Sequence, residues 1–257
     1  MSRVFITGSA DGLGQMAARL LVEMGHQVVL HARDAARAEQ ALRAVPQAQA
    51  ALIGDLSSIA ATQALAEQVN RFGRFDAVIH NAALGYREPR RVATVDGLPQ
   101  VFAVNTLAPY VLSALIDKPK RLLYLSSGLH RSGDASLDDL AWERRPWQGT
   151  AAYSDSKLHD ALLAFAIARR WPQVLSNALE PGWVATKMGG AGAPDDLQAA
   201  TKTQVWLAVS DEPAATVSGA YFYHMKPRDT HPAVHDVGVQ ERLIEACEAF
   251  SGVRLPA

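Results

Sequence analysis

Tyr153 and Lys157 are the pair of side chains in this sequence best suited to proton transfer. The apolar residues that follow them recur at helical spacing: Leu158, Ala161, Leu162 and Phe165. Residues four apart on a helix lie on the same face, one turn from each other. A phenol with an ordinary pKa of about 10 exchanges protons poorly at neutral pH, but a neighbouring ammonium group favours the phenolate and lowers that pKa. The pair predicts a proton-transfer site. The alternative is an amphipathic helix on which both side chains are merely exposed.

A second candidate site follows an apolar strand at Val4–Ile6, in the segment Thr7-Gly8-Ser9-Ala10-Asp11-Gly12-Leu13-Gly14. Apolar residues at helical spacing come next: Met16, Ala17, Leu20, Leu21 and Met24. In a strand, turn and helix of this kind, the first glycine permits the tight turn, the second lets the backbone approach phosphate, and the third lets the helix pack on the strand. We therefore expect a dinucleotide pyrophosphate to bind here. The alternative is a glycine-rich turn before an ordinary helix.

Short apolar runs alternate with helical patterns along the whole chain. The predicted strands are Val4–Ile6, Val28–Leu30, Ala51–Ile53, Ala77–Ile79, Leu122–Leu125, Val174–Leu179 and Ala220–Tyr223. Continuous apolar strands separated by helices are typical of a parallel sheet covered on both faces, with ligands at the carboxyl ends of the strands. The sequence therefore predicts an α/β fold, a doubly wound seven-stranded parallel sheet of the Rossmann type.

Composition narrows the range of functions. The 257 residues hold 25 basic and 26 acidic side chains, which argues against a nucleic-acid partner and for small molecules. A single cysteine, Cys247, excludes an internal disulfide. The start of the chain carries no apolar leader, and no run is long enough to span a bilayer, so we expect a cytoplasmic protein without a membrane anchor.

No linker marks a boundary, so the sequence predicts one domain over residues 1–257. Three segments depart from the alternation of strands and helices: Arg87–Asp96, Leu129–Thr150 and Ala185–Leu197. We expect substrate loops at about 128–150 and 185–198, because both follow strands near the presumed site. The first segment is as easily an ordinary surface loop.

The order of four motifs resembles the short-chain dehydrogenase/reductase family over nearly the whole chain. These motifs are the glycine segment, Asn81-Ala82-Ala83 after the fourth strand, Ser127 after the fifth, and Tyr153-Ser154-Asp155-Ser156-Lys157. The long interval between Ser127 and Tyr153 resembles the retinol dehydrogenase-like branch, which includes ketoreductases. The resemblance implies that hydride passes between a nicotinamide cofactor and a carbonyl or alcohol.

The resemblance also implies the catalytic roles. Tyr153 would be the general acid/base, Lys157 would tune it and bind the nicotinamide ribose, and Ser127 would hydrogen-bond the substrate oxygen. Ser126 remains an alternative to Ser127. Asn105 matches the asparagine that helps to hold a water linking the lysine to solvent; the alternative for it is a hydrogen bond inside a helix.

The same resemblance implies a set of cofactor contacts. They are Gly8, Ser9, Asp11, Gly12, Leu13 and Gly14 in the first loop, Arg33, Asp55 and Leu56 after the second and third strands, Asn81, Ala82 and Ala83 after the fourth, Tyr153 and Lys157, and Pro181, Gly182, Val184 and Thr186 after the sixth. His80 stands where the family usually has asparagine. We expect that change to affect the support of the strand more than the chemistry.

NADP(H) is favoured over NAD(H). Arg33 follows the second strand, and the preceding residue is Ala32, where NAD-preferring relatives place a carboxylate. A guanidinium group binds a 2′-phosphate in a bidentate way, whereas a carboxylate would repel it. Against this preference, Asp11 lies where many NADP-binding relatives carry a basic residue, and Asp34 follows Arg33.

Five aromatic residues lie in segments that could cover the substrate: Trp142, Trp147, Trp183, Tyr221 and Tyr223. They favour an apolar or aromatic ketone or aldehyde, although each could equally belong to the core or an interface. We expect no metal, because the spacings of His224, His231 and His235 match no usual ligand pattern. His130 beside Ser127 does not indicate a hydrolase, because no Gly-x-Ser-x-Gly turn is present.

Two other readings of the fold stay open. One is a non-catalytic NADP-binding redox sensor or interaction module, and the other is an isomerase or dehydratase that binds the cofactor without consuming it. Relatives often form dimers or tetramers through the helix that bears the tyrosine, so a homo-oligomer is possible.

Overall fold

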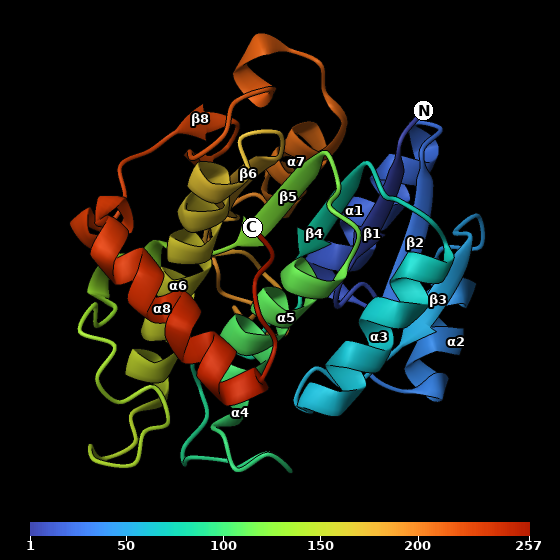
Figure 1. The fold of residues 1–257 in the computed structure, drawn as a ribbon. Coiled ribbons are helices and arrows are strands. Elements are labelled where there is room, and N and C mark those ends of the chain that lie inside the picture. Colours follow the sequence, from blue (N-terminus) through green and yellow to red (C-terminus); the bar gives the residue numbers. More distant parts are fainter.

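The computed structural model describes every residue from Met1 to Ala257 and is built on one eight-stranded sheet (Figure 1). The strand order is β3-β2-β1-β4-β5-β6-β7-β8, and all neighbours are parallel except β7 and β8. The strands are β1 Arg3–Ile6, β2 Gln27–Ala32, β3 Ala50–Ile53, β4 Ala77–His80, β5 Arg121–Leu125, β6 Leu175–Glu180, β7 Tyr221–Tyr223 and β8 Lys226–Pro227. The doubly wound Rossmann-type fold predicted from the sequence is confirmed.

The predicted number of seven strands was one too few. The additional strand, β8, is a two-residue antiparallel partner of β7. His224 and Met225 form the turn between them, and both have positive φ angles of 48° and 60°. Hairpin turns with two such residues usually contain asparagine, aspartate or glycine. Because neither residue is of that kind, the sequence gives no turn signal, and a strand this short gives no pattern.

Helices cover both faces of the sheet and divide the core in two. Phe5, Val29 and Val78 face one cluster, which holds apolar side chains of α3, α5, α6 and α8, while Val4, Ile6 and Leu30 face the other, which holds side chains of α1, α2 and α7. Alternating residues of one strand thus enter opposite cores, as expected of a sheet buried on both faces. The helices are α1 Gly12–Glu23, α2 Ala35–Ala44, α3 Ile59–Arg71, α4 Gln100–Phe102, α5 Ala108–Leu115, α6 Gly149–Arg170, α7 Leu197–Val209 and α8 Val237–Ser251.

Short irregular helices complete the chain. A π-helix, η1, continues α4 into α5 at Ala103–Leu107, and 3₁₀ turns occur at Gly128–Ser132, Pro213–Ala215 and Pro232–His235. Of the three segments predicted as loops, Arg87–Asp96 contains no helix or strand. The segment Ala185–Leu197 ends at the first residue of α7, Leu197.

The long helix α6 is enclosed by the rest of the chain. Every residue from Ala152 to Ile167 is buried. Helix α8 crosses α6 on the side away from the sheet (Figure 1). The C-terminal tail then packs on α5, where Tyr110 donates a hydrogen bond to the carbonyl of Val253 at 2.8 Å. Helix α6 therefore holds its side chains in a fixed, largely dehydrated position.

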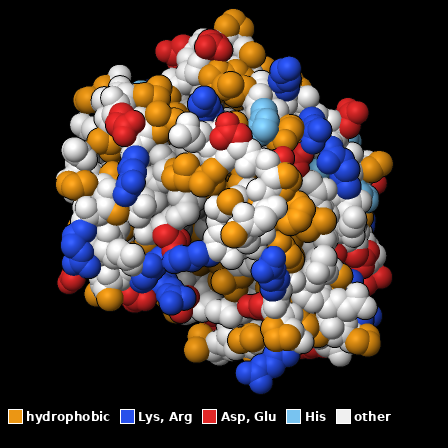
Figure 2. All heavy atoms as spheres, turned by 180° about the vertical axis from the view of Figure 1, so that it is seen from behind, with side chains coloured by type: hydrophobic (Ala, Val, Ile, Leu, Met, Phe, Trp, Pro, Cys, Tyr) orange, Lys and Arg blue, Asp and Glu red, His pale blue; other side chains and the backbone are white.

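None of the helices is both long enough and apolar enough to cross a bilayer. On the face seen from behind, basic and acidic side chains are interspersed and apolar side chains form small groups (Figure 2).

Candidate active site

The glycine segment joins β1 to α1 and holds a tight turn. Gly8 and Gly12 have φ angles of 62° and 56°, in the left-handed region that favours glycine. A side chain at Gly12 would meet no protein atom within 4 Å, whereas one at Gly14 would lie 2.4 Å from Nδ2 of Asn81. Gly12 therefore leaves an open cradle, and Gly14 allows α1 to pack against the loop after β4.

Two side chains fasten this loop to its neighbours. Thr7 Oγ1 accepts hydrogen bonds from the backbone N–H groups of Asn81 and Ala82, both at 3.0 Å, and Asn81 Nδ2 donates to the carbonyl of Thr7 at 2.9 Å. His31 in β2 was not anticipated from the sequence: its Nδ1 accepts from the Gly8 N–H at 2.9 Å, and its Nε2 donates to the Gly54 carbonyl at 2.8 Å. Burial lowers the pKa of His31 to about 4, so the ring stays neutral and keeps both contacts.

A cleft of about 980 Å³ runs along the carboxyl ends of the strands. Most residues expected to bind cofactor line it: Gly8, Asp11, Gly12, Leu13, Arg33, Asp55, Leu56, Asn81, Ala82, Ala83, Tyr153, Lys157, Pro181 and Thr186. Six residues from the sequence prediction are not among its lining: Ser9, Gly14, Asn105, Ser127, Gly182 and Val184. Ser9 is fully buried, and its hydroxyl donates to the Ile6 carbonyl, so it supports the loop from within.

Tyr153 and Lys157 lie together at the wall of the cleft. Lys157 Nζ is 5.7 Å from the centre of the Tyr153 ring, as the spacing of four residues predicts. Burial raises the pKa of Tyr153, although Lys157 and a hydrogen bond with Ser127 act in the opposite direction. The expectation that lysine lowers this pKa gives the correct direction for the pair alone, but the sequence does not reveal how deeply the phenol is buried.

The two serines after β5 have different surroundings. Ser127 Oγ accepts a hydrogen bond from the Leu129 N–H at 3.3 Å, whereas Ser126 lines the cleft but donates its hydroxyl proton to the Lys157 carbonyl at 2.7 Å. The Ser126 hydroxyl is therefore engaged by the backbone of α6, and the choice of Ser127 over Ser126 stays a prediction.

Asp160 forms a buried ion pair with Lys157. Its Oδ2 lies 2.8 Å from Nζ, which also donates to the Leu125 carbonyl at 2.7 Å. The side chains of both residues are less than 4% exposed. Burial raises the pKa of Asp160 to about 6, and Lys157 limits the rise. Asp160 was missed because, in the sequence, it belongs to the buried face of an ordinary helix.

Asn105 occupies the π-helix η1 and does not contact Lys157. Its Oδ1 accepts from the Leu84 N–H at 2.8 Å, and its Nδ2 donates to the Leu84 carbonyl and to Ser156 Oγ, both at 3.0 Å. These bonds fix the loop after β4 against α6. The side chain is 1% exposed, so its direct role in this structure is to hold that loop.

Asp11 gathers two cations at the opposite end of the cleft. Its Oδ2 lies 2.6 Å from Nη2 of Arg37 and 2.9 Å from Nζ of Lys187. Burial by itself would raise the pKa of Asp11, but Lys187 and Arg37 outweigh it and hold that pKa below its ordinary value. Arg33 lies near Asp34, 3.4 Å away, and its side chain is 74% exposed. In the sequence, Asp11 argues against a bound phosphate; in the structure, its carboxylate pairs with two basic side chains that line the cleft.

The loop after β6 crosses the mouth of the cleft. On one side of the cleft, Lys187 reaches Asp11 in the glycine loop. On the other side, the next residue, Met188, lies against Gly85, where an added Cβ would be only 2.8 Å from Met188 Cγ. Gly182 has a φ of 85°, and Val184 pairs with Asp195 to close the base of the loop. From this segment Ala185, Thr186, Lys187, Met188 and Leu197 line the cleft.

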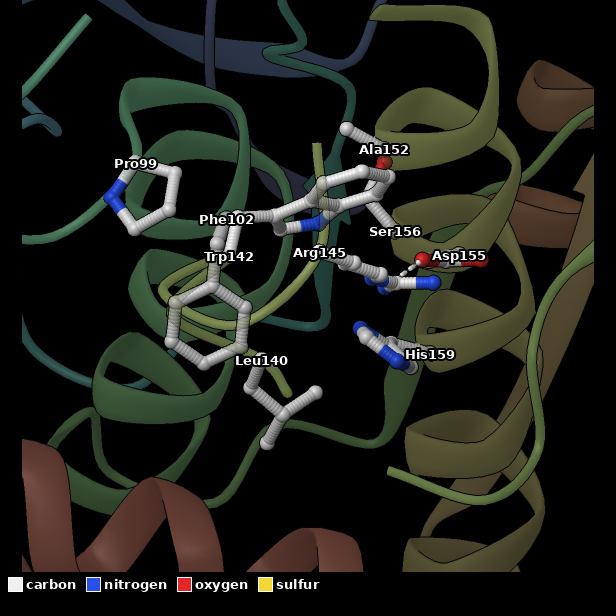
Figure 3. A pocket seen from close by; sticks show the side chains of 9 residues that line it. All are labelled: Pro99, Phe102, Leu140, Trp142, Arg145, Ala152, Asp155, Ser156 and His159. Carbon is white, nitrogen blue, oxygen red and sulfur yellow. Dashed lines mark hydrogen bonds and ion pairs between the residues drawn. The ribbon is translucent and has the colours of Figure 1, made fainter. Parts of the chain in front are cut away.

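The segment between Ser127 and α6 packs on the outer side of α6. Figure 3 shows Arg145 reaching from it to Asp155 on α6, with the two groups 2.6 Å apart. Trp142 is buried, with the guanidinium carbon of Arg145 3.7 Å from its ring centre, and Trp147 meets it edge-on. No residue of 128–150 lines the cleft. This segment anchors the helix that carries Tyr153.

Comparison with known proteins agrees with this architecture. Residues 2–119 match the family model described as short chain dehydrogenase. An uncharacterised oxidoreductase of Emericella nidulans is 47% identical, with all of this chain and 99% of the relative covered. The chain belongs to the short-chain dehydrogenase/reductase family. It is therefore an oxidoreductase, and the family resemblance drawn from its motifs is confirmed.

Other relatives of this oxidoreductase fit the predicted branch. A protein named as a daunorubicin C-13 ketoreductase, from a Streptomyces species, is 30% identical over 97% of this chain and 92% of its own length. Human retinol dehydrogenase 14 is also 30% identical, over 97% of this chain and 86% of its own. The crystal structure of an uncharacterised protein from Mycobacterium paratuberculosis superposes with a TM-score of 0.84 and 25% identity, covering 100% and 96% of the two chains.

Proposed function

We propose that this short-chain dehydrogenase/reductase is an NADPH-dependent carbonyl reductase, with Tyr153 as the proton donor. The observation that carries the proposal is the meeting of Tyr153 and Lys157 at one wall of the cleft, next to the end of β5 that leads into Ser126 and Ser127. The relative named as a ketoreductase supports this chemistry.

The residues of the cleft fit a dinucleotide. The open cradle at Gly12 and the first amides of α1 suit a pyrophosphate, and Lys157, which lines the cleft, would bind the nicotinamide ribose. When bound, the nicotinamide supplies the hydride for the carbonyl carbon. Pro181 and Thr186 line the cleft beside it and would align the carboxamide.

The chain's own residues then handle the proton. Burial raises the pKa of Tyr153, so the phenol holds its proton at neutral pH and can give it to the carbonyl oxygen as negative charge develops there. Ser127 would donate a second hydrogen bond to the oxygen. Lys157 would stabilise the phenolate left behind, while Asp160 and the Leu125 carbonyl hold its ammonium group in place.

Three basic groups support a preference for NADP(H). Arg33, Arg37 and Lys187 line the end of the cleft next to β2, and Asp11 holds two of them. A 2′-phosphate would interact favourably with these cations, and an arginine can bind it through two hydrogen bonds.

We further propose an apolar or aromatic ketone or aldehyde of fairly large size as substrate. Tyr86 meets Tyr153 edge-on, with ring centres 5.7 Å apart, and Met188 and Val104 also line the cleft. Any homo-oligomer would have to use a surface other than α6, because the chain itself already encloses that helix.

The proposal is tested by following NADPH oxidation with a panel of aromatic ketones and aldehydes. We expect turnover that is lost in Tyr153→Phe, while NADPH binding persists in the variant. NADPH binding by the wild type without turnover of any carbonyl would instead favour the sensor, and conversion of a substrate without consumption of NADPH would favour an isomerase or dehydratase.

A further inference from the structure

Arg87 is the basic residue of the cleft whose charge is not neutralised by a carboxylate of the chain. The basic side chains that line the cleft are Arg33, Arg37, Arg87, Lys157 and Lys187. All of these except Arg87 form an ion pair, with Asp34, Asp11 or Asp160. The adjacent acid, Glu88, makes no ion pair with Arg87, and its Oε2 atom is buried without a partner.

No contact assigns Arg87 a role in holding the fold. It donates no hydrogen bond, and it is exposed. Arg91, four residues further, behaves differently: its guanidinium group donates to the carbonyls of Ala141 and Gly97, at 2.9 and 2.8 Å, and ties two loops together. A guanidinium group that faces a cleft with all its donors free is suited to binding an anion.

The position of Arg87 relates it to the reacting atoms. Its guanidinium carbon lies 5.5 Å from the centre of the Tyr86 ring, and that ring lies edge-on to Tyr153. Tyr153, Tyr86 and Arg87 therefore form a row that leads from the proton donor to a positive charge. The row contains the proton donor, whereas Arg37 and Lys187, the cations paired with Asp11, lie on α2 and on the loop after β6.

The loop after β6 approaches this charge closely. Gly190, in the loop after β6, faces Arg87, and a Cβ added there would lie 3.4 Å from Nη2. Met188 covers Gly85 from the same loop. Because Gly190 has no side chain, only backbone borders the guanidinium group on this side, and a flat ligand lying along Tyr86 would reach it there.

We propose that the substrate is an aromatic carbonyl compound that also carries a carboxylate, and that Arg87 binds this carboxylate. The inference rests on the proposed reductase function. The carbonyl oxygen would meet Tyr153, the aromatic body would lie against Tyr86, and the carboxylate would accept two hydrogen bonds from the guanidinium group. Arg87 selects among carbonyl compounds and takes no part in hydride or proton transfer.

The test compares two ligands that differ mainly in charge, 4-formylbenzoate and 4-formylbenzamide. Equilibrium binding of each is measured by calorimetry on NADP⁺-saturated protein, where no reduction takes place. We expect the wild type to bind the acid about tenfold more tightly than the amide, as for a hydrogen-bonded charge pair that is partly exposed. The preference should vanish in Arg87→Met and be reduced in Arg87→Lys, which keeps the charge but loses the planar pair of donors.

Arg90→Met is the matched control, because Arg90 is exposed three residues away and does not line the cleft. It should keep the wild-type preference. Equal binding of acid and amide by the wild type, or a preference that survives in Arg87→Met, would overturn the inference.

Turnover separates this inference from the proposed function. If 4-formylbenzamide is reduced with NADPH and the acid is not preferred in binding, the reductase function is supported and the role of Arg87 is rejected. Preferential binding of the acid that depends on Arg87, without reduction of either aldehyde, establishes the anion site and rejects the reductase.

Discussion

Replacing Asp160 with asparagine is expected to lower the pKa of Tyr153. The carboxylate lies 2.8 Å from Lys157 Nζ, which is itself 5.7 Å from the centre of the Tyr153 ring. For two unit charges about 8 Å apart, an effective dielectric constant of about 20 gives an interaction of about 2 kcal/mol. Since about 1.4 kcal/mol corresponds to one pKa unit, loss of the carboxylate should lower the Tyr153 pKa by about one unit.

The sign of the effect follows from charge. Above pH 6, Asp160 is ionised, because its pKa is raised to about 6, and it opposes the influence of Lys157 on the phenol. Oxidation of an alcohol needs the phenolate of Tyr153, so its pH profile rises with that pKa. In Asp160→Asn the rise should begin at lower pH, and below about pH 6 the two proteins should converge. Tyr124 and Tyr221 also face Asp160, but burial raises the pKa of each.

The assay is kcat/KM for oxidation of a benzylic alcohol with NADP⁺, measured at several pH values. Asp138→Asn, an exposed change in the segment before α6, should leave the profile in place. A profile of Asp160→Asn that stays where it is above pH 6, or that moves to higher pH, would refute the assigned electrostatics. Thermal unfolding of each variant shows whether the fold is retained.

Other predictions concern cofactor choice and stability. Arg37→Ala should weaken NADPH binding about tenfold, as loss of a charge-assisted contact implies, while NADH binding changes little; equal weakening of both, seen by fluorescence titration, would contradict the role of the cluster. Thr7→Val leaves two backbone N–H groups without their acceptor and should lower the free energy of unfolding by about 2 kcal/mol. Thr7→Ser keeps the hydroxyl and should retain most of that free energy; urea unfolding measures both variants. His80 and His159 are buried, with pKa values lowered to about 3 from an ordinary 6.5. The stability that depends on these rings being neutral is therefore fully present above pH 6.5. It is lost as the pH falls toward about 3, because the unfolded chain then binds protons that the folded protein does not; at pH 5 the loss is about 2 kcal/mol per histidine. Urea unfolding free energies that do not fall between pH 7 and pH 5 would argue against neutral, buried histidines.

The sequence predicted the fold well because continuous apolar runs indicate buried strands and helical spacing of apolar residues indicates helices packed on them. Seven strands appear where the runs are, and the spacing of Tyr153 and Lys157 places them together on α6. The missing strand β8 depends on a turn through His224 and Met225, a pair that is not typical of hairpin turns.

The supports of the site were harder to foresee. Nothing in the sequence places Asp160 apart from other residues of a buried helix face, and nothing places His31 beneath Gly8, because both roles depend on contacts made by folding. The surroundings of Asp11 were also not visible in the sequence. Only the approach of Lys187, from 176 residues away, shows that this carboxylate belongs to a basic cluster.

The most direct test of the central claim is the rate of NADPH oxidation by wild type and Tyr153→Phe with the same aromatic aldehyde, together with the NADPH dissociation constant of each protein. We predict steady turnover by the wild type, a loss of at least a hundredfold in the variant as expected for removal of a general acid, and closely similar dissociation constants. An equal rate in the variant would show that Tyr153 is not the proton donor and would contradict the proposed mechanism.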